Sequence, residues 1–195
     1  IVGLAAADAL DRVAGVATTP GRMAIANSGS SEILITDTAG ALIHRIGRAG
    51  EGPGEFRDLS CALYVRGDSL LAYDSNLKRY SMFSPEGRYV RSFRLSNPNA
   101  ARGASVLGVV EDSIIVLQSV RPGHTVAATG TNRALMDILR VRLTGELVDT
   151  VAVVQGWESY SPNDGATTLS NMPVPFARSS YIAVSADHIV IAHSD

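Results

Sequence analysis

Four histidines are the side chains of this sequence best suited to bind a transition metal: His44, His124, His188 and His193. No two of them form the H-x-H or H-E-x-x-H spacing that places two imidazoles on one metal ion. A metal site could still assemble from side chains that distant parts of the chain bring together. Asp37 and Asp74 end strand-like segments, where carboxylates commonly accept hydrogen bonds from turn amides. We therefore predict no metal site, no catalytic residue and no cofactor from these residues.

A glycine-rich segment, residues 47–54 (GRAGEGPG), is the part of the chain that most resembles a phosphate-binding loop. A Rossmann loop requires a helix directly after its glycines, and a P-loop ends in Gly-Lys-Ser or Gly-Lys-Thr. Here Phe56 and a strand-like run follow, and the segment has no lysine. The pattern instead indicates a turn between two sheet-forming units. We expect Phe56 to pack between those units, and Glu51 and Glu55 to lie in solvent.

Two segments are candidates for ligand contact: residues 155–177, which include the only tryptophan of the chain, and the insertion at 121–134. Long loops inside a folded domain are commonly functional, and aromatic side chains on them often anchor a partner. The candidate ligand-contact residues on these loops are Trp157, Tyr160, Asn163, Asp164 and His124. The alternative for Trp157 is that its indole fills a gap between neighbouring units of the core.

Composition narrows the class of protein. The chain has 195 residues, of which 46% are hydrophobic and 18% charged, which is typical of a folded domain. Its net charge of −2 provides no field that would attract nucleic acid or an anionic membrane, so nucleic acid is not an expected partner. The sequence also lacks the roughly 18 consecutive apolar residues of a membrane-spanning helix.

The single cysteine and the first residues bear on the cellular compartment. Cys61 lies in an alternation of apolar and polar residues, which predicts a buried structural thiol, and one cysteine excludes a disulfide within the chain. The run Ala5-Ala6-Ala7 is similar to the cleavage region of a secretory signal. An extracytoplasmic location, periplasmic or secreted, is therefore the favoured expectation.

A repeated element divides the chain into units. Residues 37–46 (DTAGALIHRI), 84–93 (SPEGRYVRSF) and 142–151 (RLTGELVDTV) each have a glycine at the fourth place, followed by alternating apolar residues. The glycine suits the positive φ of a tight hairpin turn, and the alternation indicates a half-buried strand. With the strand-like runs that precede each glycine, the pattern predicts units of four short strands.

Units of four short strands that recur at about 40–50 residues are typical of β-propeller blades. We predict an all-β fold, a β-propeller of four-stranded antiparallel blades that forms an incomplete ring in a single domain. The predicted blades cover about 10–47, 58–95 and 103–154, with a partial blade at 178–195. A β-sandwich, which also has many short strands and glycine turns, is the alternative.

The run Gly47–Phe56 (GRAGEGPGEF) resembles the inter-blade segment G-x-G-x-G-P-G-x-F of NHL-type six-bladed propellers. The stretch EILITDTAGALIHRIG before it is similar to the NHL repeat, and the resemblance covers residues 10–95. The resemblance implies about six four-stranded blades around a central channel. Propellers of this kind bind proteins, RNA or glycans, and some related ones are metal-dependent hydrolases or lyases, so the fold alone does not select an activity.

The favoured function is a binding or scaffold module that recognises a protein, peptide or glycan through loops on one face. Remaining blades of a longer chain are a further expected partner, because the partial blade leaves a strand edge open, which also predicts oligomerisation or poor solubility. Enzymatic activity is less favoured, since no catalytic constellation is visible. The alternative is a metal-dependent hydrolase or lyase, which would need several Asp, Glu, Asn or His side chains at the channel mouth.

Overall fold

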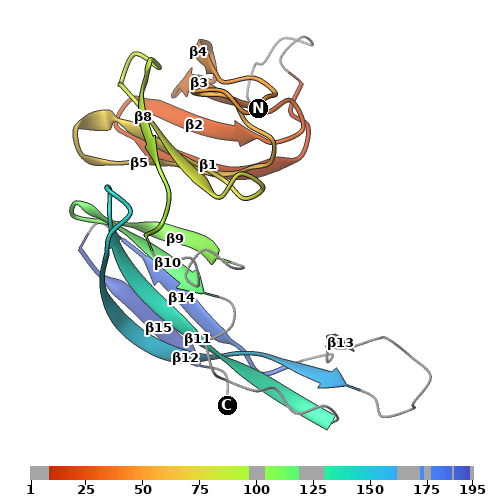
Figure 1. Cartoon of the computed structure of the whole chain (residues 1–195). Coiled ribbons are helices and arrows are strands. Elements are labelled where there is room, and N and C mark those ends of the chain that lie inside the picture. The colour runs from red at the N-terminus through yellow and green to blue at the C-terminus, as the bar shows by residue number, and fades with distance from the viewer. Residues whose placement is uncertain are drawn as a thin grey trace. The chain divides into compact units, whose positions relative to one another are not determined.

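A computed structural model of the chain describes residues 9–96, 104–118, 130–161, 172–173, 177–185 and 187–193. These residues form strands and turns, with a short 3-10 turn at Arg66–Asp68 and no α-helix among them. In the same residues no helix is long and apolar enough to cross a membrane. The chain divides into two units, Ile1–Leu95 and Ser96–Asp195, each with its own sheets (Figure 1).

The first unit consists of two four-stranded antiparallel sheets in which each strand pairs with the next along the chain. The strands of the first sheet are β1 (Val13–Thr19), β2 (Arg22–Asn27), β3 (Glu32–Asp37) and β4 (Leu42–Ile46). Those of the second are β5 (Leu59–Tyr64), β6 (Leu70–Asp74), β7 (Arg79–Phe83) and β8 (Tyr89–Phe93). Gly40 and Gly87 make the turns into β4 and β8 with φ of 87° and 79°, which confirms the predicted role of the repeated glycine.

The core of the first unit contains side chains from both sheets. Ile33 and Ile35 of β3 are buried in one cluster with Leu59 of β5 and Phe83 of β7. Phe56, from the segment between the sheets, belongs to the same cluster and has no exposed surface. Its ring centroid lies 6.1 Å from that of Phe83. The prediction that Phe56 packs between two neighbouring groups of four strands is confirmed, because the ring lies among residues of both sheets of the first unit.

The second unit has a five-stranded antiparallel sheet in the order β13-β12-β11-β10-β9 and a two-stranded sheet, β14-β15. The strands of the larger sheet are β9 (Ala104–Val110), β10 (Ser113–Gln118), β11 (Gly130–Arg142), β12 (Leu147–Ser161) and β13 (Met172–Pro173). Those of the smaller are β14 (Ser180–Val184) and β15 (Ile189–His193). β11 and β12 have 13 and 15 residues, against 7 in β9 and 6 in β10, so the β11–β12 pair extends past β9 and β10 (Figure 1).

The two sheets of the second unit pack through β9 and β14. A Cβ on Gly108 of β9 would lie 2.7 Å from the Cβ of Val184 in β14, so glycine permits the close approach of the two strands. Ile115 and Ile138 are buried in the cluster that Ile182 and Val184 pack against. The smaller sheet therefore covers the apolar face of the larger one.

Carboxylates at strand ends accept hydrogen bonds from backbone amides, as predicted. The Oδ1 atom of Asp37 accepts hydrogen bonds from the amides of Ala39 at 2.9 Å and Ala41 at 2.8 Å. Asp74 is 1% exposed, and its carboxylate accepts hydrogen bonds from the amides of Arg57 at 2.6 Å and Leu77 at 2.8 Å. These carboxylates close turns and are occupied by the backbone.

The described residues confirm the all-β class and the four-stranded antiparallel sheets of an incomplete propeller. The expected loop at 155–177 is wrong in its first part, because β12 continues to Ser161. The prediction that residues 121–134 form an inserted loop is likewise wrong in its last part, because residues 130–134 belong to β11. The two stretches pair with each other, for example Thr131 with Tyr160, and this long-range pairing overrides their loop-like composition.

Candidate functional site

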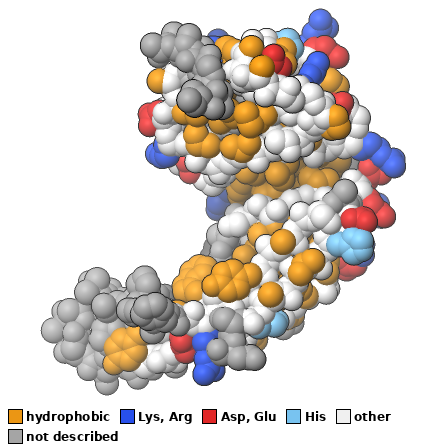
Figure 2. All heavy atoms as spheres, turned by 180° about the vertical axis from the view of Figure 1, so that it is seen from behind, with side chains coloured by type: hydrophobic (Ala, Val, Ile, Leu, Met, Phe, Trp, Pro, Cys, Tyr) orange, Lys and Arg blue, Asp and Glu red, His pale blue; other side chains and the backbone are white. Residues whose placement is uncertain are grey.

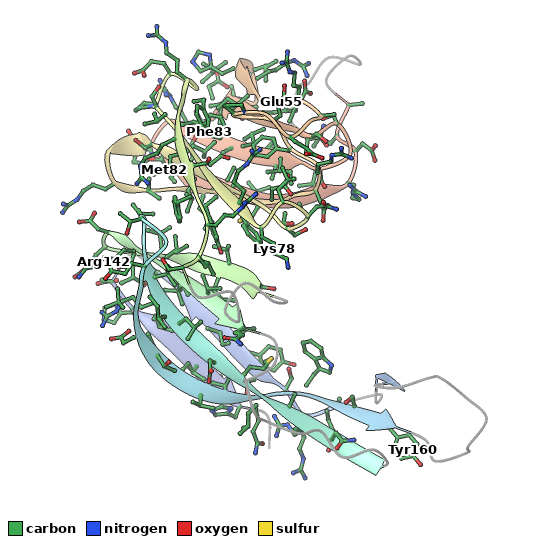
Figure 3. All side chains as sticks on the ribbon, in the orientation of Figure 1. Glu55, Lys78, Met82, Phe83, Arg142 and Tyr160 are labelled. Atoms are coloured by element: carbon green, nitrogen blue, oxygen red, sulfur yellow. The ribbon has the colours of Figure 1, made fainter. Side chains whose placement is uncertain are left out.

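The exposed aromatic side chains of β12 are the main candidate for ligand contact. Trp157 is 56% exposed and Tyr160 is 46% exposed. Both lie on a strand rather than on the predicted loop. Figure 3 shows Tyr160 toward the end of β12 that lies next to β13, with which it pairs through Met172. The alternative in which Trp157 fills a gap in the core is wrong, because more than half of its surface is open to solvent.

A β-bulge places Trp157 on the strand. Gly156 and Trp157 stand opposite a single residue of β11, Ala134, and such bulges change the direction in which a side chain points. A Cβ on Gly156 would lie 3.2 Å from the carbonyl oxygen of Ala134, so glycine suits this position. The Nε of Arg133 donates a hydrogen bond of 3.0 Å to the carbonyl oxygen of Gly156. The bulge is therefore fixed on the β11 side by backbone packing and one side chain.

The other edge of β12 is fixed by the segment that leads into β14. The Ser180 hydroxyl donates a hydrogen bond of 2.6 Å to the carbonyl oxygen of Gln155. The amide of Glu158 donates one of 2.9 Å to the carbonyl oxygen of Arg178. The backbone on both sides of Trp157 is thus held, and the indole projects from a rigid support.

Ser180 also lies beside a histidine, and the geometry bears on catalysis. The Nδ1 atom of His193 is 2.8 Å from the Ser180 hydroxyl oxygen. Because the hydroxyl proton goes to the Gln155 carbonyl, the imidazole is the donor in this contact. A nucleophilic serine requires the opposite arrangement, in which the histidine accepts the hydroxyl proton. The pair therefore joins β14 to β15 and does not form an activated nucleophile.

The remaining candidates from the sequence, His124, Asn163 and Asp164, lie outside the described residues. The structure therefore brings Trp157 and Tyr160 onto one strand and does not place the other three. Sequence reasoning missed the contributions of Arg133 and Ser180, which are distant from Trp157 along the chain. No local pattern identifies either of them, because each acts through strand pairing or sheet packing.

The glycine-rich segment 47–54 is held by Arg79 of β7. Its guanidinium donates hydrogen bonds to the carbonyl oxygens of Glu51 at 2.7 Å, Gly52 at 2.9 Å and Glu55 at 2.6 Å. An arginine directed at three backbone carbonyls fixes the path of the chain. The segment thus serves the connection between sheets, as the sequence predicts, and its backbone carbonyls give no support to a phosphate site.

The expectation that Glu55 lies in solvent is wrong. Its side chain is 20% exposed and its carboxylate accepts hydrogen bonds of 2.8 Å from both the Gly52 amide and the Nε of Arg48. The hydrogen bond from Gly52, followed by that from Arg48, lowers the pKa of Glu55. Glu51 does lie in solvent, with 61% of its side chain exposed, in an ion pair of 2.6 Å with Arg57. The difference arises because the carboxylate of Glu55 folds back onto the amide of Gly52 in its own turn.

Metal binding and acid–base chemistry gain no support from the described residues. No three His, Cys, Asp or Glu side chains in this part of the chain gather closely enough to hold a metal ion. Burial raises the pKa of the Cys61 thiol to about 12 and also raises the pKa of Tyr80. These shifts move the groups away from neutrality, whereas a catalytic acid or base needs a pKa near the working pH.

Hydrophobic side chains reach the surface in several places on the face of the molecule that Figure 2 shows. Exposed members on β12 are Leu147, Val148, Val151, Val153, Trp157 and Tyr160. Exposed apolar side chains that lie on one strand are candidates for ligand contact.

Comparison with known proteins supports the fold. Residues 9–97 match the model of the family DUF5128, described as a 6-bladed beta-propeller. No curated protein matches the sequence. A candidate exported protein from Bacteroides fragilis superimposes with a TM-score of 0.58 and 18% identity, over 99% of this chain and 53% of that one. The chain thus spans about half the length of this structural relative, and the likeness concerns the fold alone.

Two further solved structures are similar at a lower level. Hydrazine synthase from Kuenenia stuttgartiensis has a TM-score of 0.44 and 11% identity, over 80% of this chain and 46% of that one. A streptogramin B lyase has a TM-score of 0.43 and 11% identity, over 93% of this chain and 67% of that one. Neither likeness bears on the function of this chain.

Proposed function

We propose that this chain is a binding module of a β-propeller and that Trp157 contacts the bound partner. The observation that carries the proposal is the exposed indole, 56% open to solvent, on a strand whose backbone is hydrogen-bonded at Gln155 and Gly156. A rigidly supported aromatic side chain buries a large area at a small cost in conformational entropy, which is why tryptophan is common among the residues that dominate binding.

The partner class that the strand fits best is a protein or peptide segment. Tyr160 is three residues further along β12, about 10 Å from Trp157 in an extended strand. Side chains three residues apart on a strand point to opposite faces, so Trp157 alone is the anchor that we assign to a chain-like ligand. A glycan would also stack on an exposed indole, so the experiment includes both ligand classes.

The experiment uses the fact that Trp157 is the only tryptophan. Its emission is therefore a probe of this site alone. The whole chain is titrated against an array of extended peptides and an array of glycans, and the emission maximum of the indole is recorded. We expect a blue shift with peptides, because a bound segment removes water from the ring.

The matched control is Trp157→Phe with binding measured by calorimetry, which keeps an aromatic ring and removes the indole. Tyr181→Ala serves as a second control, since Tyr181 is an aromatic side chain that is 64% exposed on a different strand, β14. We expect Trp157→Ala to weaken the binding of a responding peptide about tenfold or more and Tyr181→Ala to leave it unchanged. A response to glycans only would mean that the partner is a glycan rather than a peptide. No response to either array would overturn the proposal.

We also propose that the ring is of the NHL-like, six-bladed type and that the protein is extracytoplasmic. The glycine-rich run GRAGEGPGEF and the match of residues 9–97 to a six-bladed family support the first statement. The Ala5-Ala6-Ala7 run and the exported character suggested for the Bacteroides fragilis relative support the second. Fractionation of cells that produce the natural full-length protein would test the location, since an extracytoplasmic protein is recovered in the periplasmic or secreted fraction and a cytoplasmic one in the cytosolic fraction.

A further inference from the structure

One stretch of the long strand β12 has no second partner strand among the described residues. Its residues Leu147–Val153 pair with β11 on one side, while the hydrogen bonds and strand pairs that the described residues form on the other side of β12 lie at Gln155 and beyond. Val148 and Val151 are each 41% exposed and Val153 is 42% exposed. The stretch therefore combines open backbone with apolar side chains, which natural edge strands usually avoid.

The direction of the backbone groups at this edge follows from the serine contact. The carbonyl oxygen of Gln155 points away from β11, because it accepts the hydrogen bond of Ser180. In an antiparallel strand the N–H and C=O of one residue point to the same side, and the side alternates along the chain. The register is regular from Val153 to Gln155, so the N–H and C=O of Val153 also point away from β11. This residue offers a donor and an acceptor to an added strand.

The charge at this edge is balanced within the chain. Asp149 is the sole charged residue of Leu147–Val153, and its carboxylate forms an ion pair with Arg140 of β11. No proline interrupts the stretch. The lysines, prolines or unpaired charges that keep other strands away from an exposed edge are therefore missing from this one. A ligand of opposite charge would gain little here, so the edge favours an uncharged one.

Extended backbone already occupies the next part of the same edge. The carbonyl of Arg178 accepts the hydrogen bond of the Glu158 amide, and β13 pairs with Ser159 and Tyr160. A second copy of the chain is a poorer occupant of the free part, because a stable protein pair uses roughly 20–30 residues on each side and this edge has seven. A short extended peptide needs only the main-chain groups of a few residues.

From these observations we infer that the edge Leu147–Val153 of β12 binds an uncharged, extended segment of a partner protein by β-strand addition. This inference rests on the proposed binding role of β12 and names how the partner is held: the main chain supplies hydrogen bonds, and Val151 and Val153 contact apolar side chains of the segment. Trp157 then lies beyond the end of the added strand, where it contacts the same partner.

The test uses the whole chain and a fluorescein-labelled heptapeptide of alternating threonine and valine, with binding followed by fluorescence anisotropy. A second peptide of the same sequence is N-methylated at alternate residues, which removes main-chain donors and keeps the side chains. We expect the first peptide to bind and the second to show no binding over the same concentrations.

Two variants alter the edge, and one is the control. Val153→Pro removes the outward N–H without removing a group that pairs with β11, and Val153→Lys introduces an unpaired charge. Each is expected to weaken binding of the first peptide about fivefold or more, as expected for a lost hydrogen bond or a buried charge. Val90→Lys alters a valine of β8 that is 58% exposed and should leave binding unchanged. Circular dichroism identifies a variant that fails to fold, and the N-methylated peptide tests the inference without any variant.

Equal binding of the two peptides, equal weakening by Val90→Lys and Val153→Lys, or absence of binding would each overturn the inference. Light scattering that shows a dimer which Val153→Lys dissociates would also overturn the inference, and it would assign the edge to a second copy of the chain. If the Trp157 emission responds to glycans while neither heptapeptide binds, the inference fails and the binding function stands. If the heptapeptide binds and the Trp157 emission responds to neither array, strand addition at the β12 edge is supported and the proposed contact through Trp157 is overturned.

Discussion

The hydroxyl of Ser180, the first residue of β14, donates a hydrogen bond of 2.6 Å to the carbonyl oxygen of Gln155 in β12. This bond joins the two sheets of the second unit two residues before Trp157. The same hydroxyl accepts a hydrogen bond from His193. One small side chain therefore links three strands and steadies the support of the exposed indole.

Replacing Ser180 with alanine should loosen that support. We expect Ser180→Ala to lower the free energy of unfolding by about 1–2 kcal/mol, because the hydrogen bonds of the hydroxyl with Gln155 and His193 are both lost. Time-resolved anisotropy of Trp157 should show faster local motion of the indole. Ser105→Ala, at an exposed serine of β9, is the control and should leave both measurements unchanged. Identical anisotropy in both variants would mean that Ser180 does not hold the site.

Removing the ring of Phe56 should destabilise the first unit strongly. The side chain is fully buried among residues from both sheets of that unit, so Phe56→Ala leaves a cavity that the neighbours fill only in part. We expect a loss of about 3–5 kcal/mol in urea denaturation followed by circular dichroism. Val90→Ala removes a side chain that is 58% exposed and should change stability by less than about 0.5 kcal/mol. A small effect of Phe56→Ala would show that the sheets do not depend on this contact.

Asp74 should tolerate an amide better than an apolar side chain. Its carboxylate accepts hydrogen bonds from the amides of Arg57 and Leu77, and the corresponding residue at the end of β2 is Asn27. We expect Asp74→Ala to lower the free energy of unfolding by about 1–3 kcal/mol and Asp74→Asn to cost less. Hydrogen exchange at the amides of Arg57 and Leu77 should quicken more in the alanine variant. Equal losses in the two variants would mean that the negative charge, rather than the acceptor, is required.

The thiol of Cys61 should be unreactive in the folded protein. Burial raises its pKa to about 12, so the folded state holds the neutral thiol where an unfolded chain would begin to ionise at a pKa of about 8.5. The contribution of the neutral thiol to the stability of the folded state is therefore complete below the pKa of the unfolded chain, and it is lost as the pH rises toward 12. We expect little reaction with a chromogenic disulfide reagent at about pH 8 in buffer and rapid reaction in urea. Rapid labelling of the folded chain at that pH would show that this partly exposed thiol does not have the raised pKa.

Sequence reasoning located the features that depend on neighbouring residues. Gly40 and Gly87 have the positive φ that the repeated glycine predicts, because a tight turn is determined locally. Phe56 follows the glycine-rich run at a position where the chain passes between sheets, and it is buried there. The arrangement of four strands per sheet in the first unit follows from such local signals repeated along the chain.

The errors concern features that depend on distant residues. Trp157 has Gly and Ser nearby in sequence, which indicates a loop, whereas pairing of its strand with residues 130–136 makes it part of a sheet. Glu55 was expected in solvent because its charge suits the surface, whereas the amide of Gly52 and the guanidinium of Arg48 bind its carboxylate. In both cases the partner that determines the outcome is set by the fold of the chain rather than by the pattern at the residue itself.

The end of the second strand of each sheet has a different polar residue: Asn27, Asp74, Gln118 or His193. For Asn27, the side-chain oxygen accepts a hydrogen bond of 2.7 Å from the amide of Asp11, in the way that Asp74 accepts one from Arg57. The position requires hydrogen-bonding capacity and accepts a neutral amide, an anion or an imidazole. Single substitutions at the ends of these second strands can therefore change the local electrostatic potential of a sheet and leave its backbone ladder unaltered.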